Sequence, residues 1–228
     1  MRLRIFAAIL LAPVLFGTAA RAQLFNNVDS NYVNSHYTER LDFFKKMPDQ
    51  KHEIVFLGNS ITEGGEWQEI IPGRAVLNRG ISGDVSYGVL ARMDDVLSSR
   101  PDKIFLLIGI NDLKRGTSAE AILSVYGRII KQVRQQSPKT KLYIQSILPV
   151  NEQMLPQIYN KINNSIIKSL NGQLQQLCNT PEVIYVDLHP TFEDGSGQLK
   201  KDWSIDGLHL RAAAYIQWVN RLKFLKVL

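Results

Sequence analysis

The sequence predicts an α/β fold, a three-layer α/β/α sandwich of the flavodoxin-like kind with a five-stranded parallel sheet. Short apolar runs of strand length alternate along the chain with longer segments of helical periodicity. The strand runs are apolar almost throughout, which is typical of strands that helices cover on both faces. Because such sheets bind ligands at the carboxyl ends of their strands, the loops that follow those strands are the expected place for chemistry.

The first half of the chain predicts two helices and three strands. Residues 35–47 place Tyr37, Leu41 and Phe44 on one helical face, and Pro48 ends the helix. The other elements are strands over 54–57 and near 75–77, a helix over about 86–97 and an apolar strand over 103–108.

The second half predicts three helices and two strands. Residues 117–120 read as a capping box, and the helix that they open has Ile122, Val125, Ile129 and Val133 facing inward. A second amphipathic helix follows from the spacing of Ile158, Ile162, Ile166, Leu170, Leu174 and Leu177. Strands over 142–147 and 183–186 and a final helix over about 211–225 complete the pattern. No internal repeat or linker interrupts it, so residues 23–228 are expected to form a single domain.

Residues 1–22 have the layout of a secretory signal peptide. Arg2 and Arg4 form a short basic region, residues 5–16 are almost wholly apolar, and residues 20–22 form a small-x-small cleavage site. The apolar run is short for a bilayer span, which favours cleavage after Ala22 over an uncleaved membrane anchor. The sequence therefore predicts an exported protein, periplasmic or secreted, with no stable membrane anchor.

Composition excludes several kinds of partner and cross-link. The net charge of +6 falls to +3 when Arg2, Arg4 and Arg21 leave with the signal peptide, and +3 is not a nucleic-acid-binding signature. The only cysteine, Cys178, has no partner for an intramolecular disulfide, and we expect it to be a small buried residue on a helix. No His, Asp and Glu cluster has metal-ligand spacing, so no metal or other cofactor is expected.

Polar residues gather directly after the predicted strands. The groups are 58–60 (Gly-Asn-Ser), 78–84 (Asn-Arg-Gly-Ile-Ser-Gly-Asp), 109–112 (Gly-Ile-Asn-Asp), 187–189 (Asp-Leu-His) and 206–209 (Asp-Gly-Leu-His). Each group alone is typical of a turn or a helix cap. Together on one edge of one sheet they indicate a site with a serine nucleophile, a histidine base and an orienting carboxylate.

These motifs resemble the four blocks of the SGNH hydrolases, also called GDSL lipases or esterases. The family's Gly-Asp-Ser block is matched by residues 58–60, with Asn59 in place of aspartate. Its glycine block is matched by 81–84, its Gly-x-Asn-Asp block by 109–112 and its Asp-x-x-His block by 206–209. Order and spacing agree from residue 54 to the end of the chain. The similarity is greatest to the platelet-activating-factor acetylhydrolase catalytic subunits and the exported bacterial acetylesterases related to them.

The residues support the roles that the resemblance implies. Ser60 needs a base to become a nucleophile, His209 can take and return its proton, and Asp206 can hold the imidazole in the right tautomer. The oxyanion needs donors, and the expected ones are the backbone N–H groups of Ser60 and Gly83 and the side-chain amide of Asn111. Glycine suits the second position because the backbone must approach the ester closely.

Other assignments are open to the sequence. His189, after Asp187, is a rival base, whereas His36 and His52 lie outside the strand-end loops and are expected at the surface. An α/β-hydrolase elbow would need glycine where Thr62 stands, and the glycine fingerprint of a dinucleotide-binding fold is absent. A non-catalytic carbohydrate- or lipid-binding domain is the alternative outside enzymes, and an activated ester would distinguish it by binding without turnover.

The substrate is predicted only by class. The family and the site imply a small-molecule or glycan ester, with acetyl esters of carbohydrates or small glycerolipids favoured over the longer acyl chains of a lysophospholipase or lipase. Trp67, Tyr87 and Trp203 lie close in sequence to the expected site, so they are candidates for contacting the substrate or, equally, for packing in the core.

Overall fold

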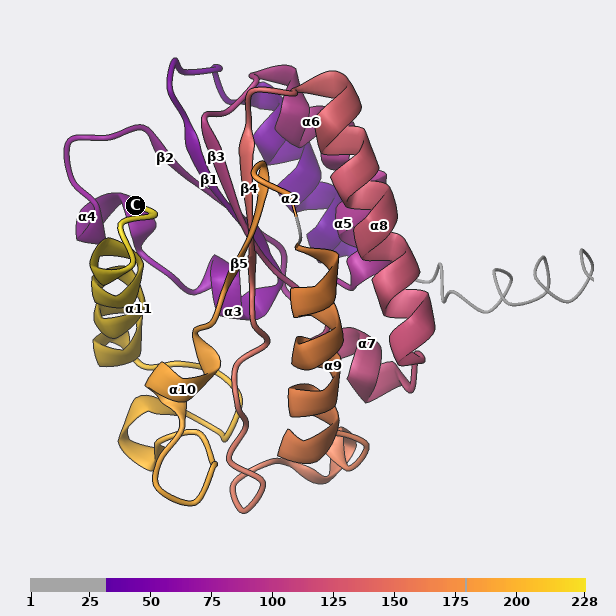
Figure 1. Cartoon of the computed structure of the whole chain (residues 1–228), viewed down its shortest axis with the longest axis vertical. Helices are drawn as coiled ribbons and strands as arrows, with labels where there is room; N and C mark the ends of the chain where they lie inside the picture. Colours follow the sequence, from indigo (N-terminus) through magenta and orange to yellow (C-terminus); the bar gives the residue numbers. More distant parts are fainter. Residues whose placement is uncertain (1–31, 179) are drawn as a thin grey trace, which may run out of the picture.

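The computed structural model describes residues 32–178 and 180–228, so the predicted signal peptide lies outside the described residues. Figure 1 shows one sheet between layers of helices, which confirms the predicted sandwich. The strands lie in the order β2-β1-β3-β4-β5, and all four neighbouring pairs are parallel. Their bounds are β1 (Ile54–Gly58), β2 (Val76–Gly80), β3 (Lys103–Leu107), β4 (Lys141–Gln145) and β5 (Val183–Val186).

Helices cover both faces of this sheet. In Figure 1, α2, α5, α6, α8 and α9 lie on one side, and α4, α10 and α11 lie on the other. No helix in the described part of the chain is long and apolar enough to cross a membrane. The bounds are α2 (Ser35–Lys46), α3 (Ser60–Glu63), α4 (Trp67–Ile70), α5 (Ser86–Ala91), α6 (Met93–Ser98), α7 (Ile110–Arg115), α8 (Ala119–Gln136), α9 (Asn164–Leu177), α10 (His189–Phe192) and α11 (Ala212–Phe224), with 3-10 turns at η1 (Gln157–Tyr159) and η2 (Lys201–Trp203).

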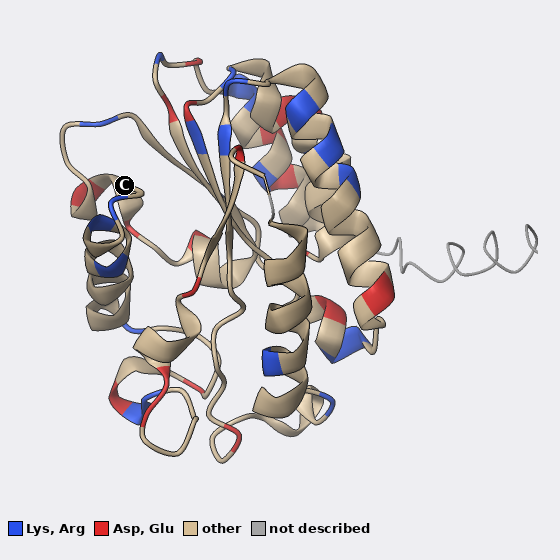
Figure 2. Ribbon diagram, in the orientation of Figure 1, with Lys and Arg blue, Asp and Glu red and all other residues tan. Residues whose placement is uncertain are grey.

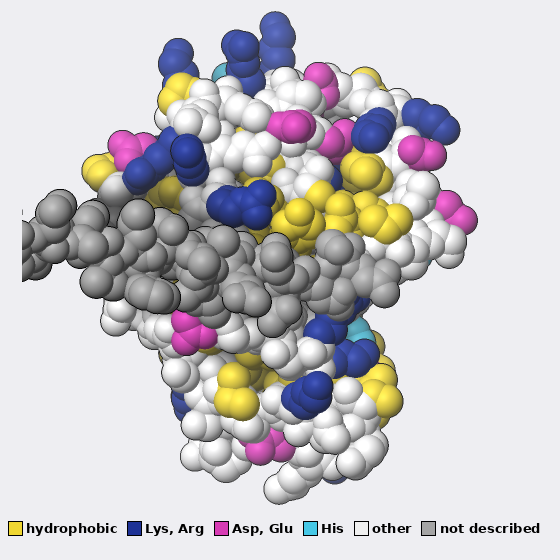
Figure 3. All heavy atoms as spheres, turned by 90° about the vertical axis from the view of Figure 1, so that its right-hand side faces the viewer, with side chains coloured by type: hydrophobic (Ala, Val, Ile, Leu, Met, Phe, Trp, Pro, Cys, Tyr) yellow, Lys and Arg dark blue, Asp and Glu magenta, His cyan; other side chains and the backbone are white. Residues whose placement is uncertain are grey.

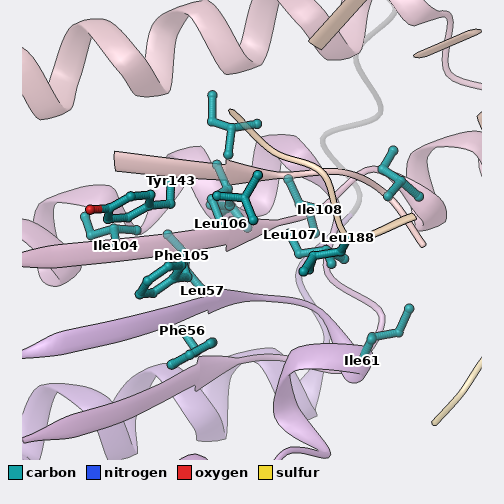
Figure 4. Packing of buried hydrophobic residues seen from close by; sticks show 14 of the residues in the cluster. Phe56, Leu57, Ile61, Ile104, Phe105, Leu106, Leu107, Ile108, Tyr143 and Leu188 are labelled. Atoms are coloured by element: carbon teal, nitrogen blue, oxygen red, sulfur yellow. The ribbon is translucent and has the colours of Figure 1, made fainter. Parts of the chain in front are cut away.

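An aromatic ladder runs across the sheet. Phe56, Phe105 and Tyr143 are register partners on β1, β3 and β4, and their rings stack at centroid distances of 5.0 and 4.7 Å. Figure 4 shows these rings among the buried leucines and isoleucines of the same strands. Because each large apolar side chain stabilises the fold by about 1.5–3 kcal/mol when buried, this ladder fixes the register of the strands. The register in turn brings the strand ends to a common edge.

Charged residues lie on the outer helices and near the strand ends, with few along the strands themselves (Figure 2). The face turned toward the viewer in Figure 3 carries basic and acidic side chains interspersed with apolar ones. This distribution leaves the sheet as an apolar platform, and it confines polar chemistry to the loops at its edges.

The helix predicted over 86–97 is wrong in one respect, because it is broken at Arg92. Two short helices, α5 and α6, meet at this residue, whose backbone angles (φ −113°, ψ 13°) are not helical. Arg92 is buried, and its side chain turns inward to polar groups at the strand ends. A straight helix would instead have continued past the residue.

The helix predicted from Ile158 onward begins later, at Asn164. The side chain of Asn163 caps it by accepting the N–H of Ile166 at 2.9 Å. The preceding residues form a loop with the turn η1, and Ile158 is 63% exposed there, so its place in the apolar spacing was coincidental. The predicted capping box is also shifted by one residue, because Ser118 is the N-cap of α8.

Candidate active site

Ser60 lies at the junction of β1 and α3. The strand ends at Gly58, Asn59 caps the helix by accepting the N–H of Ile61 at 3.0 Å, and Ser60 is the first helical residue. The first turn of a helix leaves its backbone N–H groups without helical partners. Ser60 therefore presents both a hydroxyl and a free N–H at the carboxyl edge of the sheet.

Residues 206–209 form a tight turn on the same edge. The Oδ1 atom of Asp206 accepts the N–H groups of Leu208 and His209 at 3.0 and 2.8 Å. Gly207 has φ +91°, and a side chain there would come within 2.7 Å of the Asn151 carbonyl oxygen. The turn therefore requires glycine at this position and fixes the carboxylate and the imidazole relative to each other.

These two segments, 149 residues apart in the chain, meet in a hydrogen-bonded row. His209 Nδ1 lies 2.7 Å from Asp206 Oδ2, and His209 Nε2 lies 3.0 Å from Ser60 Oγ. An ionised carboxylate only accepts hydrogen bonds, so Nδ1 carries the proton and Nε2 is left to accept the hydroxyl hydrogen of Ser60. Chemically, an imidazole held in this way can remove that hydrogen while the hydroxyl oxygen attacks an electrophile.

Asp206 stays ionised in this arrangement. Burial acts to raise its pKa, but hydrogen bonds from the backbone and side chain of His209 and from Leu208 outweigh burial and hold the pKa below its ordinary value. Its side chain is about one-third exposed, as is that of His209. The row is thus open to solvent at one side and to a ligand arriving from that side.

The loop after β2 brings Gly83 to the same edge. Gly83 has φ +82°, a left-handed conformation that favours glycine, and a Cβ added there would meet no atom within 4 Å. Ser82, just before it, donates its N–H and hydroxyl to the carboxylate of Glu63 at 2.6 and 2.5 Å. This loop is therefore tied to the helix that begins at Ser60.

Asn111 follows β3 and is 9% exposed. Its Nδ2 atom donates one hydrogen to the carbonyl oxygen of Asp84 at 2.9 Å, which leaves the second amide hydrogen for another acceptor. Asp112 anchors the same loop by accepting hydrogen bonds from the N–H and hydroxyl of Ser86. These hydrogen bonds act to lower its pKa, but burial outweighs them and raises the pKa to about 6. The predicted donors thus belong to three loops that hydrogen bonds connect.

The family model described as GDSL-like lipase/acylhydrolase matches residues 56–216, a span that contains all four motifs. The chain belongs to this family. Together with the names of its relatives, this membership makes the protein a carboxylic ester hydrolase.

Relatives of the GDSL-like family extend the comparison. Platelet-activating factor acetylhydrolase IB subunit alpha1 of Bos taurus is 24% identical over 195 residues, covering 82% of this chain and 78% of its own. A Streptococcus pneumonia structure described as a platelet activating factor is 30% identical, with a TM-score of 0.80 over 92% of this chain and 99% of that one. The fold also matches an acetylxylan esterase from Geobacillus stearothermophilus, with a TM-score of 0.61 and 17% identity over 79% and 95% of the two chains.

The other histidines have different surroundings from the one in the row. His189 is 5% exposed, with Nδ1 at 3.0 Å from the Ile147 carbonyl oxygen and Nε2 at 3.5 Å from Glu193. Its ring nitrogens therefore face the Ile147 carbonyl oxygen and Glu193 rather than Ser60, as expected of a packing residue. His36 and His52 are both exposed, as predicted, and His36 contacts Glu63 one turn after Ser60.

The three aromatic residues proposed for substrate contact differ in their positions. Trp67 was the wrong choice, because it is 1% exposed and its ring stacks on Phe56 in the core at 3.9 Å. Tyr87 packs beside the Tyr32 ring and under Arg128, along α5 and α8. Trp203 is partly buried under Lys200 and against Phe192. The sequence around a tryptophan between a strand and a helix is compatible with both substrate contact and core packing, and only the tertiary structure distinguishes the two.

Two charged residues near the row were missed from the sequence. Glu63 connects Ser82 with His36, and Arg92 connects the ends of β1 and β2 with Asp84. The sequence did contain a sign that Arg92 is buried, since it is a charged residue on the helix face that also carries the buried Val89, Met93 and Val96. Among the described residues no group of three or more His, Cys, Asp and Glu side chains is arranged to hold a metal ion.

Proposed function

We propose that the protein is a serine esterase that hydrolyses short-chain esters, chiefly acetyl esters of carbohydrates or small glycerolipids, through an acyl-enzyme on Ser60. The observation that carries the proposal is the row in which Asp206, His209 and Ser60 lie at 2.7 and 3.0 Å. The order of carboxylate, imidazole and hydroxyl, and the tautomer of His209, match what nucleophilic catalysis by serine requires.

The reaction proceeds in two halves. Ser60 Oγ attacks the ester carbonyl carbon while its proton moves to His209 Nε2, and the carbonyl oxygen becomes an oxyanion. Collapse of this intermediate breaks the bond to the alkoxy group, which leaves as the alcohol with the proton from His209. Water then attacks the acyl-enzyme with the same proton transfers, so the acid is released and Ser60 is restored. Asp206 stabilises the imidazolium that forms in each half.

The oxyanion is held by three donors in this proposal. They are the backbone N–H groups of Ser60 and Gly83 and the free amide hydrogen of Asn111. Neither backbone N–H donates to another described residue, and Asn111 is held by Asp84 with one hydrogen to spare. Each such donor stabilises the transition state by about 2.7–4 kcal/mol in comparable sites.

Support for acetyl esters comes from the relatives. Two of them are named acetylhydrolase and acetylxylan esterase, and serine-to-alanine and histidine-to-alanine variants of the second are described as catalytic mutants. Carbohydrate or glycerolipid esters also fit an exported enzyme. We propose export with cleavage after Ala22, and a mature protein that begins elsewhere than Gln23 would contradict that assignment.

Labelling with a fluorophosphonate tests the nucleophile. The reagent should add to one residue, which peptide mass mapping should identify as Ser60. Ser60→Ala should lower kcat for an acetyl ester by about 10³-fold or more while the protein stays folded. Ser137→Ala is the matched control, because Ser137 is a buried serine at the end of α8, before β4, and its hydroxyl pairs with that of Thr140. Labelling at another residue, or near-normal turnover by Ser60→Ala, would refute the assignment.

A further inference from the structure

Arg92 is a buried cation at the centre of the strand-end loops. Its side chain is 1% exposed, and four of its five N–H groups have acceptors. The Nε and Nη2 atoms donate to Asp84 Oδ2 at 3.0 and 2.9 Å, Nη2 also donates to the carbonyl oxygen of Gly58 at 3.0 Å, and Nη1 donates to that of Arg79 at 2.9 Å. One guanidinium thus joins the ends of two strands and one loop.

Two of these contacts, those with Gly58 and Asp84, lie close in sequence to a proposed oxyanion donor. Gly58 is two residues before Ser60, and Asp84 is the residue after Gly83. The carbonyl oxygen of Asp84 accepts one amide hydrogen of Asn111, which orients the other hydrogen. Moving the Arg92–Asp84 pair would therefore displace all three donors, although neither residue belongs to the hydrogen-bonded row.

We infer that Arg92 and Asp84 are positioning residues that hold the three oxyanion donors at a common point. The inference rests on the proposed esterase function. Donors must lie about 2.7–3.1 Å from the position that the oxyanion takes up, so displacements of a fraction of an ångström weaken transition-state binding. The planar guanidinium suits the task, since its fork reaches several acceptors in fixed directions, whereas an ammonium is a single point.

A gain in folding stability does not by itself explain why a buried ion pair occupies this position. Replacing a buried ion pair by apolar residues of similar size is often neutral or stabilising, because both charges lose their hydration. Apolar side chains could fill the space between α5, α6 and the sheet, but they could not bind the carbonyl oxygens of Gly58 and Arg79. The hydrogen bonds to those oxygens are the property that the arginine supplies.

Arg92→Lys is the test, because it keeps the charge and loses the fork. For a short acetyl ester, kcat should fall by about 10- to 100-fold, while KM stays within about threefold of the wild type, since misplaced donors matter only when charge develops. A boronic acid that forms a tetrahedral adduct with the serine should bind at least about tenfold more weakly. Asp84→Asn should have the same pattern, and the double variant should lose little more than the worse single one.

Val133→Ala is the matched control for reduced stability. Val133 is buried on α8, and its truncation should lower the melting temperature without changing kcat or boronate affinity. If folded Arg92→Lys and Asp84→Asn keep the wild-type kcat and boronate affinity, the pair is structural only and the inference is wrong. If neither variant folds, the pair is required by the fold rather than by the donors, which also refutes the inference. A wild-type protein that hydrolyses no ester would instead refute the proposed function.

Discussion

At the scale of single residues, the proposed oxyanion site depends on the hydrogen that each amide has left to donate. Asn111 gives one hydrogen to Asp84 and keeps the other, so Asn111→Ala should cost about 10²–10³ in kcat with a smaller change in KM. Steady-state kinetics with an acetyl ester measure both. Asn171→Ala is the control, because Asn171 is also buried and binds the backbone of Ile147, so it should lower stability and leave kcat unchanged. A large rise in KM with kcat intact would make Asn111 a substrate-binding residue instead.

The choice between two histidines belongs to the same scale. Because Asp206 is held in its ionised form, the loss of activity at acidic pH should report the imidazole that accepts the serine proton. His209→Ala should remove most of the rate together with this acidic limb. His189→Gln keeps an amide for the Ile147 carbonyl oxygen and should retain the wild-type profile. The opposite result in a pH–rate series would move the base to His189.

At the scale of elements, Glu63 connects the first helix to the site. It lies on α3, accepts hydrogen bonds from Ser82 before Gly83, and contacts His36 and Arg40 on α2. Burial acts to raise its pKa, but the hydrogen bonds from Ser82 and His36 prevail and hold it below the ordinary value. The folded state therefore favours the carboxylate, and the stability gained from it is present above the unfolded pKa and lost as the pH falls through the folded one.

Glu63→Gln should consequently lower stability in a pH-dependent way. At neutral pH we expect a loss of about 1 kcal/mol in the free energy of unfolding, less than the usual contribution of a charge-assisted hydrogen bond because the group is partly exposed. The difference from the wild type should shrink as the pH falls below about 4.3, the ordinary glutamate pKa. Thermal unfolding across this range measures it, with exposed Glu39→Gln on α2 as the control. A difference that is constant with pH would show that the carboxylate contributes nothing.

At the scale of the whole molecule, short connections favour small acyl groups. Three of the five connections at the carboxyl edge are a few residues long. The longer ones are 187–211, which holds α10, η2 and the 206–209 turn, and 146–163, which contacts Gly207 through Asn151 and exposes Ile158. Since each methylene that finds a fitting apolar surface adds about 0.8 kcal/mol, an enzyme for fatty acyl groups would present more such surface.

We therefore expect kcat/KM for an acetyl ester to exceed that for an octanoyl ester of the same alcohol by about tenfold or more, or about 1.4 kcal/mol. A chain-length series with one activated alcohol measures this ratio, followed by acetylated sugars and a lysophospholipid. Rates that climb steadily from acetyl to octanoyl would contradict the expectation. In that case Ile158→Ser should reduce the octanoyl rate selectively.

The sequence determined the layers, the five strands and the four motifs, because apolar periodicity and local turn chemistry are properties of short segments. It also indicated Ser60, Asp206 and His209, since their roles need particular residue types after strands. Only the tertiary structure decided that Trp67 lies in the core, that the helix after β2 breaks at Arg92 and that α9 begins at Asn164. These features depend on contacts between segments that are distant in sequence. An inward-facing charge or ring is stabilised by residues from another element, and the local sequence pattern does not show which residues those are.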